Sequence, residues 1–284
     1  MTHAQTVNQQ YLSDYEVHLY QEERSQNTIQ KYLRDVKKLL NFLDDNQITK
    51  TQVLAFKETL LLEYAPSSVN SMLAAINGFL DWLALPLCKV KPLKIQRNIF
   101  AHPEKELSQK EYERLIQTAE QQKNKKLSLL IQTICATGIR VSELQHITVS
   151  ALHTGRATVH CKGKNRIIFL PKELCKTLKS YCREIGVHRG SVFVTKSGKP
   201  LDRSNIWKMM KQLCAVAKVA HSKVFPHNLR HLFARTYYKI EKDISRLADI
   251  LGHSSINTTR IYTMETGTKH IQQLERMKLL YGNL

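Results

Sequence analysis

The sequence lacks a long apolar run and is poor in acidic residues. Across 284 residues no apolar stretch approaches the ~20 residues that cross a bilayer, and the polar start MTHAQTVNQQYLSDYE has no signal-peptide core. Asp and Glu number 24 against 43 Lys and Arg, which gives a formal charge of +19. This excess predicts a polyanionic partner, and without a membrane segment we expect nucleic acid. We therefore expect a cytoplasmic protein associated with the nucleoid and not with a membrane.

The cysteines form no CxxC pair, which excludes the common zinc spacings. The six are Cys88, Cys135, Cys161, Cys175, Cys182 and Cys214. Most lie in apolar or helical surroundings, which is typical of reduced core thiols in a cytosolic protein. His227 and His231 have the i, i+4 spacing of a metal pair, but no acidic residue lies between them and Arg230 would repel a cation. We expect no metal site and no other cofactor.

Residues 1–85 predict four helices that enclose a small core. The second helix has a cap at Ser25 or Asn27 and an apolar face that runs from Ile29 to Leu43. Trp82, in the fourth helix, is expected in the core or at an interface. The other face of the second helix is basic, and it is predicted either to bind DNA phosphates or only to face solvent; its residues are Lys31, Arg34, Lys37 and Lys38.

Residues 86–106 contain three prolines and several Lys and Arg without sustained periodicity, so we predict a basic linker. A second domain, 107–284, begins with a capping box of Ser108 and Glu111. It is helical except for a hairpin in which ATVHC and RIIFL flank the turn KGKN. Residues 203–219 predict a helix whose inner face holds Ile206, Met209, Met210, Leu213 and Val216. An amphipathic helix near 268–281 is expected to dock on its own domain or on a neighbouring subunit; its apolar residues are Ile271, Leu274, Met277 and Leu280. The fold class is therefore mainly α, with a small β-hairpin and two domains.

One group of polar side chains in the second domain suits phosphate chemistry. His227 and Arg230 are three residues apart, so they share a face of a helix. Arginine offers a planar fork of donors, histidine donates or moves a proton, and tyrosine supplies an oxygen nucleophile. The candidate residues are Arg140, Lys162 or Lys164, His227, Arg230, His253 and Tyr262.

The motifs that carry these residues resemble the tyrosine recombinase family, the phage integrase group. They are ATGIRVSEL at 136–144, KGK at 162–164, HNLRH at 227–231, LGHSSINTT at 251–259, and Tyr262. The N-terminal helical unit is similar to the core-binding domain of that family. The resemblance therefore extends over essentially the whole chain and implies a two-domain clamp on DNA.

The resemblance implies a role for each residue. Arg140 and Arg230 hold the scissile phosphate, and His227 and His253 match the two histidines of the site. Tyr262 matches the nucleophile, and Glu143 matches an acidic residue that supports the site without reacting. Lys162 matches the hairpin lysine that protonates the leaving oxygen. The turn here is one residue shorter than usual and Cys161 stands where glycine is common, so Lys164 stays an alternative.

The resemblance further implies a site-specific recombinase that needs no metal. Tyr262 would form a 3′-phosphotyrosyl link with double-stranded DNA, and strands would be exchanged through a Holliday junction. A homo-oligomer is implied, a dimer on each site and a tetramer at synapsis, with the helix at 268–281 exchanged between neighbours.

The biological role is left between several alternatives. We expect no extra arm-binding domain before the first helical unit, which favours a simple recombinase of the resolvase or chromosome-dimer type over a large phage integrase. Resolution of transposon cointegrates is the first expectation for its role. Chromosome or plasmid dimer resolution and phage-type integration or excision are alternatives. A type IB topoisomerase shares the same chemistry. A non-catalytic DNA-binding regulator has no need of Tyr262, which argues against that class.

Overall fold

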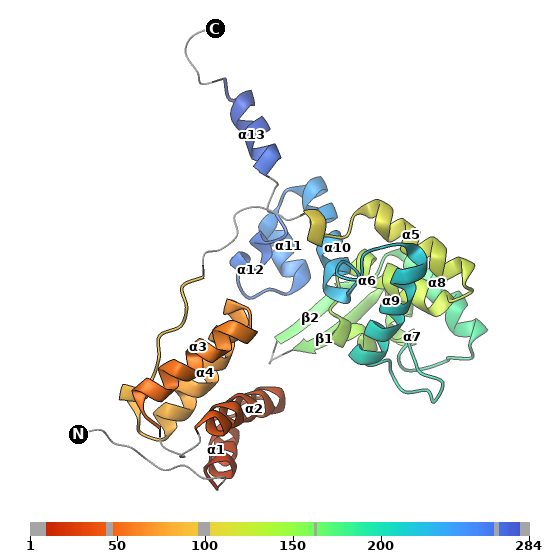
Figure 1. The fold of residues 1–284 in the computed structure, drawn as a ribbon. Helices are drawn as coiled ribbons and strands as arrows, with labels where there is room; N and C mark the ends of the chain where they lie inside the picture. Colours follow the sequence, from red (N-terminus) through yellow and green to blue (C-terminus); the bar gives the residue numbers. More distant parts are fainter. Residues whose placement is uncertain (1–9, 44–47, 96–102, 162–163, 264–266, 279–284) are drawn as a thin grey trace. The chain divides into compact units, whose positions relative to one another are not determined.

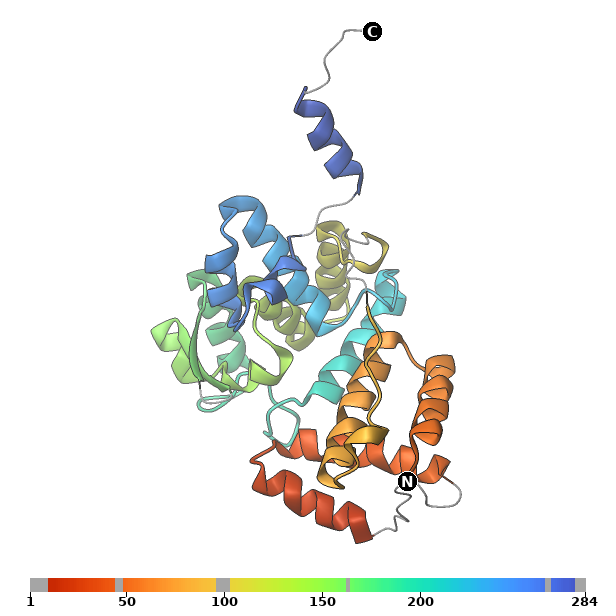
Figure 2. The ribbon, with the colours of Figure 1, turned by 90° about the vertical axis from the view of Figure 1, so that its left-hand side faces the viewer.

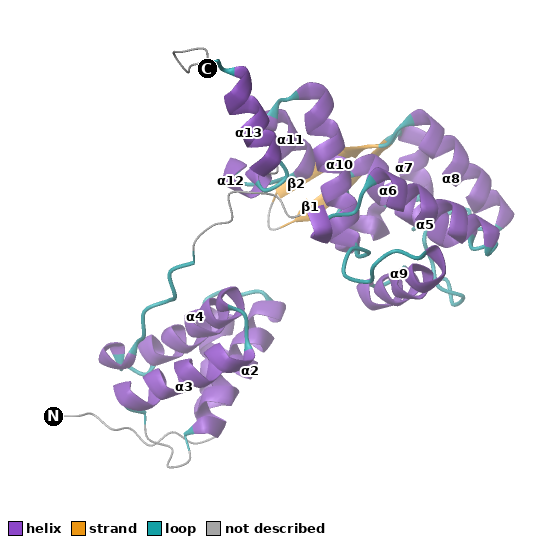
Figure 3. Ribbon diagram, turned by 45° about the horizontal axis from the view of Figure 1, so that its top comes forward, coloured by secondary structure: helices purple, strands orange, loops and turns teal. Residues whose placement is uncertain are grey.

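The structure, a computed structural model, describes residues 10–43, 48–95, 103–161, 164–263 and 267–278. Contacts divide the chain into two compact units, Met1–Arg97 and Asn98–Leu284, and each is described by itself. Helices dominate both units, and the strands of the described residues form one hairpin (Figure 1 and Figure 3). The predicted two-domain, mainly α architecture is confirmed. None of the helices described is long and apolar enough to cross a membrane.

The first unit contains four α-helices and a short 3-10 turn (Figure 2). Two helix starts have a side-chain cap: Ser25 accepts a hydrogen bond from the Thr28 amide and Thr49 accepts one from the Gln52 amide, both at 3.3 Å. Of the two caps that the sequence allowed for the second helix, Ser25 is the one used. The elements are α1 (Gln10–Gln21), α2 (Gln26–Phe42), α3 (Lys50–Glu63), α4 (Pro66–Trp82) and η1 (Pro86–Cys88).

Trp82 belongs to an aromatic cluster that closes one side of this unit. Its ring lies 5.3 Å from the Tyr15 ring and 5.8 Å from the Phe79 ring, centroid to centroid. Tyr15 and Phe79 are fully buried, and burial raises the pKa of Tyr15 to about 12. Trp82 itself is half-buried and packs against the core of the unit, so of the two predicted places, core or interface, the structure supports the core.

The segment that follows η1 is built into the first unit. Asn77 exchanges two hydrogen bonds with the backbone of Val90, at 2.8 and 3.0 Å, and Asn70 does the same with Leu93, at 2.9 and 2.7 Å. Val90 is buried. The predicted linker, 86–106, therefore begins too early, because two asparagines of α4 satisfy the backbone of this irregular segment.

In the second unit, further helices and the hairpin surround the buried helix α6. Its first elements are η2 (Pro103–Lys105), α5 (Gln109–Gln121), α6 (Lys125–Thr137), η3 (Val141–His146), α7 (Val149–Thr154), β1 (Arg156–Cys161) and β2 (Lys164–Phe169). They are followed by α8 (Lys172–Glu184), α9 (Arg203–Ala217), α10 (Pro226–Glu241), α11 (Ile244–Leu251), α12 (Ile256–Arg260) and α13 (Gly267–Arg276). The capping box of Ser108 and Glu111 is present at the start of α5, and α6 packs against α5, α8 and α10.

The hairpin pairs β1 and β2 antiparallel, with Cys161 opposite Lys164 and Val159 opposite Arg166. Ala157 and Val159 of β1, and Ile168 just before the end of β2, are buried in the core of the unit. The predicted turn of four residues is therefore shorter, because Lys164 and Asn165 already pair within the ladder.

Two expectations on helix faces differ from the structure. Val216, predicted on the inner face of α9, is 57% exposed, and Ala217 is buried instead because it continues the period of Ile206 and Met210. In α13 the side chains of Ile271 and Leu274 are 58% and 66% exposed, so this helix does not bury its apolar face on the described residues of its own chain. Leu280, the last residue of the predicted face, lies outside the described residues.

Gly138 ends α6 in the left-handed conformation, at φ +61°, and turns the chain into η3. A Cβ at this position would lie 2.4 Å from the Phe233 ring of α10. Glycine is therefore required here both by the backbone and by the close packing of α6 on α10.

We expect Gly138→Ala to destabilise the protein by more than a matched substitution at Gly186. Both glycines have positive φ, but nothing lies within 4 Å of a Cβ at Gly186. Gly186→Ala should cost about 1–2 kcal/mol of unfolding free energy for the left-handed backbone alone, and the clash with Phe233 should add about 1–3 kcal/mol. Urea denaturation of both variants measures the difference. Equal losses would show that Phe233 moves away freely.

Candidate active site

Helix α10 places three polar side chains on the face that points to α6 and α11. Pro226 fills its first turn, where the missing amide hydrogen costs nothing. His227, Arg230 and His231 follow at spacings of three and four residues and so share this face. Arg230 is only 2% exposed, and its guanidinium donates to the carbonyl of Gly138 and, at 2.6 Å, to that of Leu251.

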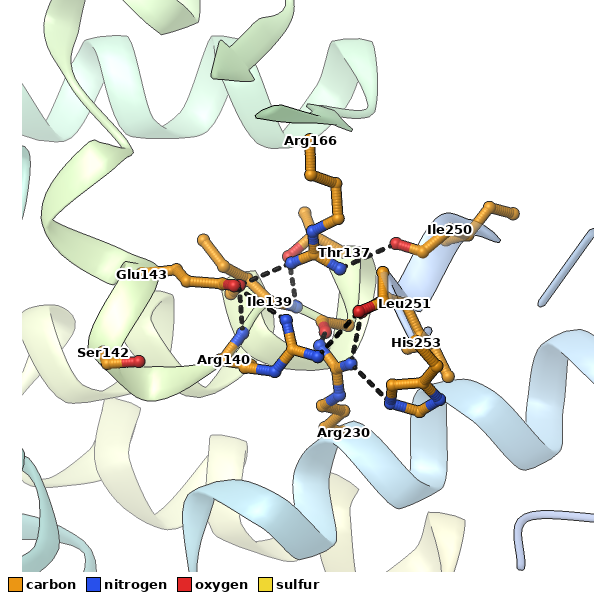
Figure 4. A network of polar contacts seen from close by, with 12 residues as sticks. Thr137, Ile139, Arg140, Ser142, Glu143, Arg166, Arg230, Ile250, Leu251 and His253 are labelled. Carbon is orange, nitrogen blue, oxygen red and sulfur yellow. Dashed lines mark hydrogen bonds and ion pairs between the residues drawn. The ribbon is translucent and has the colours of Figure 1, made fainter. Parts of the chain in front are cut away.

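Three arginines converge on the C-terminal end of α11 (Figure 4). Arg166 donates to the carbonyl of Ile250 at 2.8 Å, Arg230 to that of Leu251, and Arg140 to that of Gly252 at 3.0 Å. These carbonyls have no partner within the helix, and the helix dipole makes this end negative. The end of α11 thus acts as a shared acceptor that holds three cations, here called the arginine cluster, close together.

Glu143 supplies the carboxylate of this cluster. It is 4% exposed and lies in η3. One of its oxygens accepts from the Arg140 guanidinium at 2.9 Å, and the other accepts from the Arg140 amide at 2.9 Å and from Arg166 at 2.5 Å. A carboxylate this buried needs such partners, and in turn it orients both guanidiniums.

His253 follows the glycine that ends α11, and both of its ring nitrogens have partners. Its Nε2 lies 3.0 Å from the Arg230 guanidinium and its Nδ1 lies 2.9 Å from the Thr259 hydroxyl. Because arginine only donates, Nε2 accepts, and in the neutral ring the proton is then on Nδ1 and is donated to Thr259. Arg230 therefore fixes the tautomer of His253, and the buried Thr259 helps to hold the orientation of its ring.

Tyr262 lies just after the short helix α12, and its side chain is 2% exposed. Its amide donates to the carbonyl of Thr259 at 2.9 Å. Its ring packs edge-on against His231, with centroids 4.4 Å apart, and stacks on His253 at 5.8 Å. Burial and the nearby charge of Arg140 lower the pKa of Arg230 to about 10, and the adjacent Tyr262 partly offsets this shift. The Tyr262 hydroxyl thus lies beside the most buried cation of the site.

The three histidines of the site are held neutral at pH 7. Burial lowers the pKa of His231 to about 3 and that of His253 to about 4, and neighbouring positive charge acts in the same direction. Burial, Arg230 and Arg140 also lower the pKa of His227. Neutral histidines can accept a proton, whereas charged ones would add to the repulsion among the arginines.

Most of the residues that the sequence singled out lie together. Arg140, Glu143, Arg230 and His253 are joined by hydrogen bonds directly or through the end of α11, and Tyr262 and His227 pack against them. Lys162 lies outside the described residues. Lys164 begins β2, and its side chain is not described. The choice between these two lysines therefore stays a prediction.

The basic stripe on α2 is partly engaged within its own unit. Lys31 donates to Asp35 at 2.7 Å and to the Ser71 carbonyl at 2.9 Å, and Lys38 donates to the Tyr64 hydroxyl at 2.7 Å. Arg34 reaches Asp35 at 3.4 Å with a side chain that is 67% exposed, and Lys37 is exposed. DNA binding by the stripe stays a prediction.

Two residues of the site, Arg166 and Thr259, were missed by sequence reasoning. A signal for Arg166 was present: it occupies the same side of β2 as Ile168, two residues on, which is buried. An arginine at a position that faces the core needs an anionic or carbonyl partner nearby. Thr259 had no such signal, because threonine is also a common residue of short helices and turns.

Comparison with protein families decides the classification. The model of the phage integrase family matches residues 105–268, more than half of the chain. The chain belongs to the phage integrase family. A second family model, the SAM-like N-terminal domain of phage integrases, matches residues 12–85.

Proteins similar in sequence to this chain are named tyrosine recombinases. XerD of Halalkalibacterium halodurans is 30% identical over 274 residues, which cover 86% of this chain and 89% of the relative. XerA of Pyrococcus furiosus is 28% identical over 286 residues, which cover 97% and 96%. The predicted class of enzyme, a tyrosine site-specific recombinase, is confirmed.

Solved recombinase and integrase structures share the fold. The crystal structure of XerA recombinase is 27% identical, has a TM-score of 0.52, and the match covers 96% of this chain and 99% of that one. A lambda integrase dimer bound to a COC′ core site is 19% identical with a TM-score of 0.75, and the match covers 100% and 99%. At that identity the lambda integrase match shows the fold alone.

We expect the free energy of unfolding of this integrase family member to fall as the pH drops from 7 to 5. The unfolded chain binds protons at its histidines near pH 6.5, whereas burial keeps His231 neutral until about pH 3. Protonation therefore favours the unfolded state in this window, by up to about 1.4 kcal/mol per pH unit for each such histidine.

Urea denaturation at pH 7 and pH 5 measures this slope. His231→Gln should make the slope shallower, whereas His188→Gln, at an exposed position, should leave it as in the wild type. An unchanged slope in His231→Gln would mean that His231 takes up a proton in the folded protein near its ordinary pKa.

Proposed function

We propose that this recombinase cleaves a DNA strand by attack of the Tyr262 hydroxyl on a phosphodiester. The attack forms a 3′-phosphotyrosyl link and releases a 5′-hydroxyl, so one P–O bond forms as another breaks. A 5′-hydroxyl from a partner strand then reverses the step and joins the strands. The observation that carries the proposal is the place of Tyr262, packed among three neutral histidines and beside Arg230.

Arg140 and Arg230 are assigned to the phosphate in this mechanism. Charge increases on the non-bridging oxygens as the nucleophile attacks, and fixed cations in a buried site stabilise that charge. Each guanidinium has five N–H donors, and the protein contacts described above occupy only some of them. The remaining donors are available for the substrate oxygens.

The histidines are assigned to proton movement around Tyr262. Tyrosine has an ordinary pKa of ~10, so its hydroxyl must lose a proton to attack at neutral pH. His227 is our candidate to accept it, because burial and the two arginines lower its pKa and keep the ring neutral. His253 can donate to a phosphate oxygen only after its Nε2 leaves the Arg230 guanidinium or takes up a proton.

Double-stranded DNA and a homo-oligomer are the proposed partners. The formal charge of +19 supports a polyanionic substrate. Solved relatives are described as a lambda integrase dimer on a core site, a lambda integrase tetramer on a Holliday junction and XerH bound to its difH substrate. We infer a dimer on each site and a tetramer at synapsis, with α13 and its exposed apolar residues offered to a neighbouring subunit.

Dimer resolution is now the favoured biological role. Transposon cointegrates are the first expectation from the sequence, but the relatives named XerD and XerA favour resolution of chromosome dimers. Mapping covalent cleavage junctions in the native host distinguishes the two roles, since the junctions fall either at a chromosomal site or within a mobile element.

Tyr262→Phe should abolish the covalent protein–DNA adduct without weakening DNA binding. The change removes one hydroxyl oxygen and leaves the packed ring in place. A suicide substrate, nicked beside the cleavage site, traps the adduct for gel analysis, and a binding assay on the intact site gives the affinity. Tyr237→Phe, a tyrosine of the same apolar cluster, is the control and should form adduct normally. Adduct formation by Tyr262→Phe would refute the assignment.

Lys162→Ala should lose cleavage on normal DNA and regain it on DNA with sulfur at the 5′ bridging position. An alkoxide is a poor leaving group and needs a proton, which Lys162 would supply as a general acid. A thiolate leaves without that proton because its ordinary pKa is only ~8.5. Lys164→Ala on the same pair of substrates is the comparison. Rescue of Lys164→Ala, with no defect in Lys162→Ala, would move the role to Lys164.

A further inference from the structure

Arg166 joins two segments of the site that are far apart in the sequence. Its guanidinium contacts Glu143 in η3 at 2.5 Å and the Ile250 carbonyl at the end of α11 at 2.8 Å, as Figure 4 shows. Its side chain is 11% exposed. The stem passes so close to Gly252 that a Cβ there would lie 2.4 Å from the Arg166 Cδ. Gly252 thus leaves space for the Arg166 side chain, and the contacts with Glu143 and Ile250 hold its guanidinium.

Arg166 also shares Glu143 with Arg140. The two guanidiniums contact the same buried carboxylate, and one oxygen of Glu143 is contacted by both residues. Without Arg166, the charged partner left to Glu143 among the described residues would be Arg140. Opposite charges in a poorly solvated site interact strongly, so the carboxylate would then neutralise Arg140 more fully and hold its donors more tightly.

The net positive charge of the cluster also depends on Arg166. With Arg166 present, three guanidiniums face one carboxylate, so positive charge remains to stabilise the phosphate as it is attacked. With Arg166 absent, two guanidiniums would face the same carboxylate. The net charge of these groups would fall from +2 to +1, although no residue assigned to the phosphate had been changed.

We propose that Arg166 is a positioning residue that balances Glu143 and so leaves Arg140 available to the scissile phosphate. This role rests on the proposed function, in which Arg140 contacts that phosphate. Arg166 itself acts through Glu143 and through the end of α11. The contacts that carry this role are the ones to Glu143 and to the Ile250 carbonyl.

The decisive experiment combines Arg166→Met with Glu143→Gln. Methionine keeps an unbranched stem over Gly252 and removes the charge. Cleavage is followed in single turnover on a suicide substrate at saturating enzyme, and DNA affinity is measured separately. Arg166→Met should cleave on the order of 10²-fold more slowly, as expected for a misplaced catalytic group, with DNA affinity unchanged. Adding Glu143→Gln should restore most of the lost rate, because no carboxylate then competes for Arg140.

Arg166→Lys separates charge balance from a mechanical clamp. Lysine keeps a positive charge next to Glu143 but has a single head group in place of the two-ended fork. The charge role predicts a much smaller loss of rate than in Arg166→Met. A clamp between η3 and α11 predicts equal losses, and a clamp also predicts no rescue by Glu143→Gln. This variant keeps the proposal testable if Arg166→Met does not fold.

The control is Lys223→Met, which breaks a half-buried ion pair with Glu111 in the same unit. It should cleave at the wild-type rate, and thermal unfolding shows whether its stability loss matches that of Arg166→Met. Wild-type cleavage by Arg166→Met, or a double variant no faster than Arg166→Met, would overturn the proposal. Absence of any adduct with the wild type would instead count against the proposed function.

Discussion

The site depends on the negative end of one short helix. Carbonyls of three successive residues, Ile250 to Gly252, each accept a hydrogen bond from a different arginine. Like charges repel, so a cluster of three guanidiniums, two of them largely buried, needs an anionic counterpart before any substrate arrives. The end of α11 and Glu143 together supply it. Since these partners come from the backbone and from η3, the cluster is assembled by the fold itself.

Most of this site is predictable from the sequence because its residues lie in short motifs with strong local geometry. His227 lies three residues before Arg230, which places both on one face of a helix, and the Leu-Gly pair before His253 marks a helix end. Patterns of apolar residues likewise predicted the helical first domain and the hairpin, and Ser108 with Glu111 predicted the start of α5. These are local signals, which act over a few residues.

What the sequence did not reveal depends on contacts between distant segments. Arg166 became interpretable only when its partners, Glu143 and Ile250, were known, and they lie 23 and 84 residues away. The segment after η1 looked like a linker because the asparagines that hold Val90 and Leu93 are ordinary residues of a preceding helix. The prediction for Val216 was wrong because Val216 and Ala217 are both apolar, and only Ala217 packs in the core.

Thr259 links two residues of the site, His253 and Tyr262. The same residue holds His253 through its hydroxyl and Tyr262 through its backbone carbonyl. It lies in α12, a helix of five residues. A shift of this small element would withdraw the nucleophile and release the orientation of His253 in one movement. The place of the Tyr262 backbone and the orientation of His253 are therefore coupled through one residue.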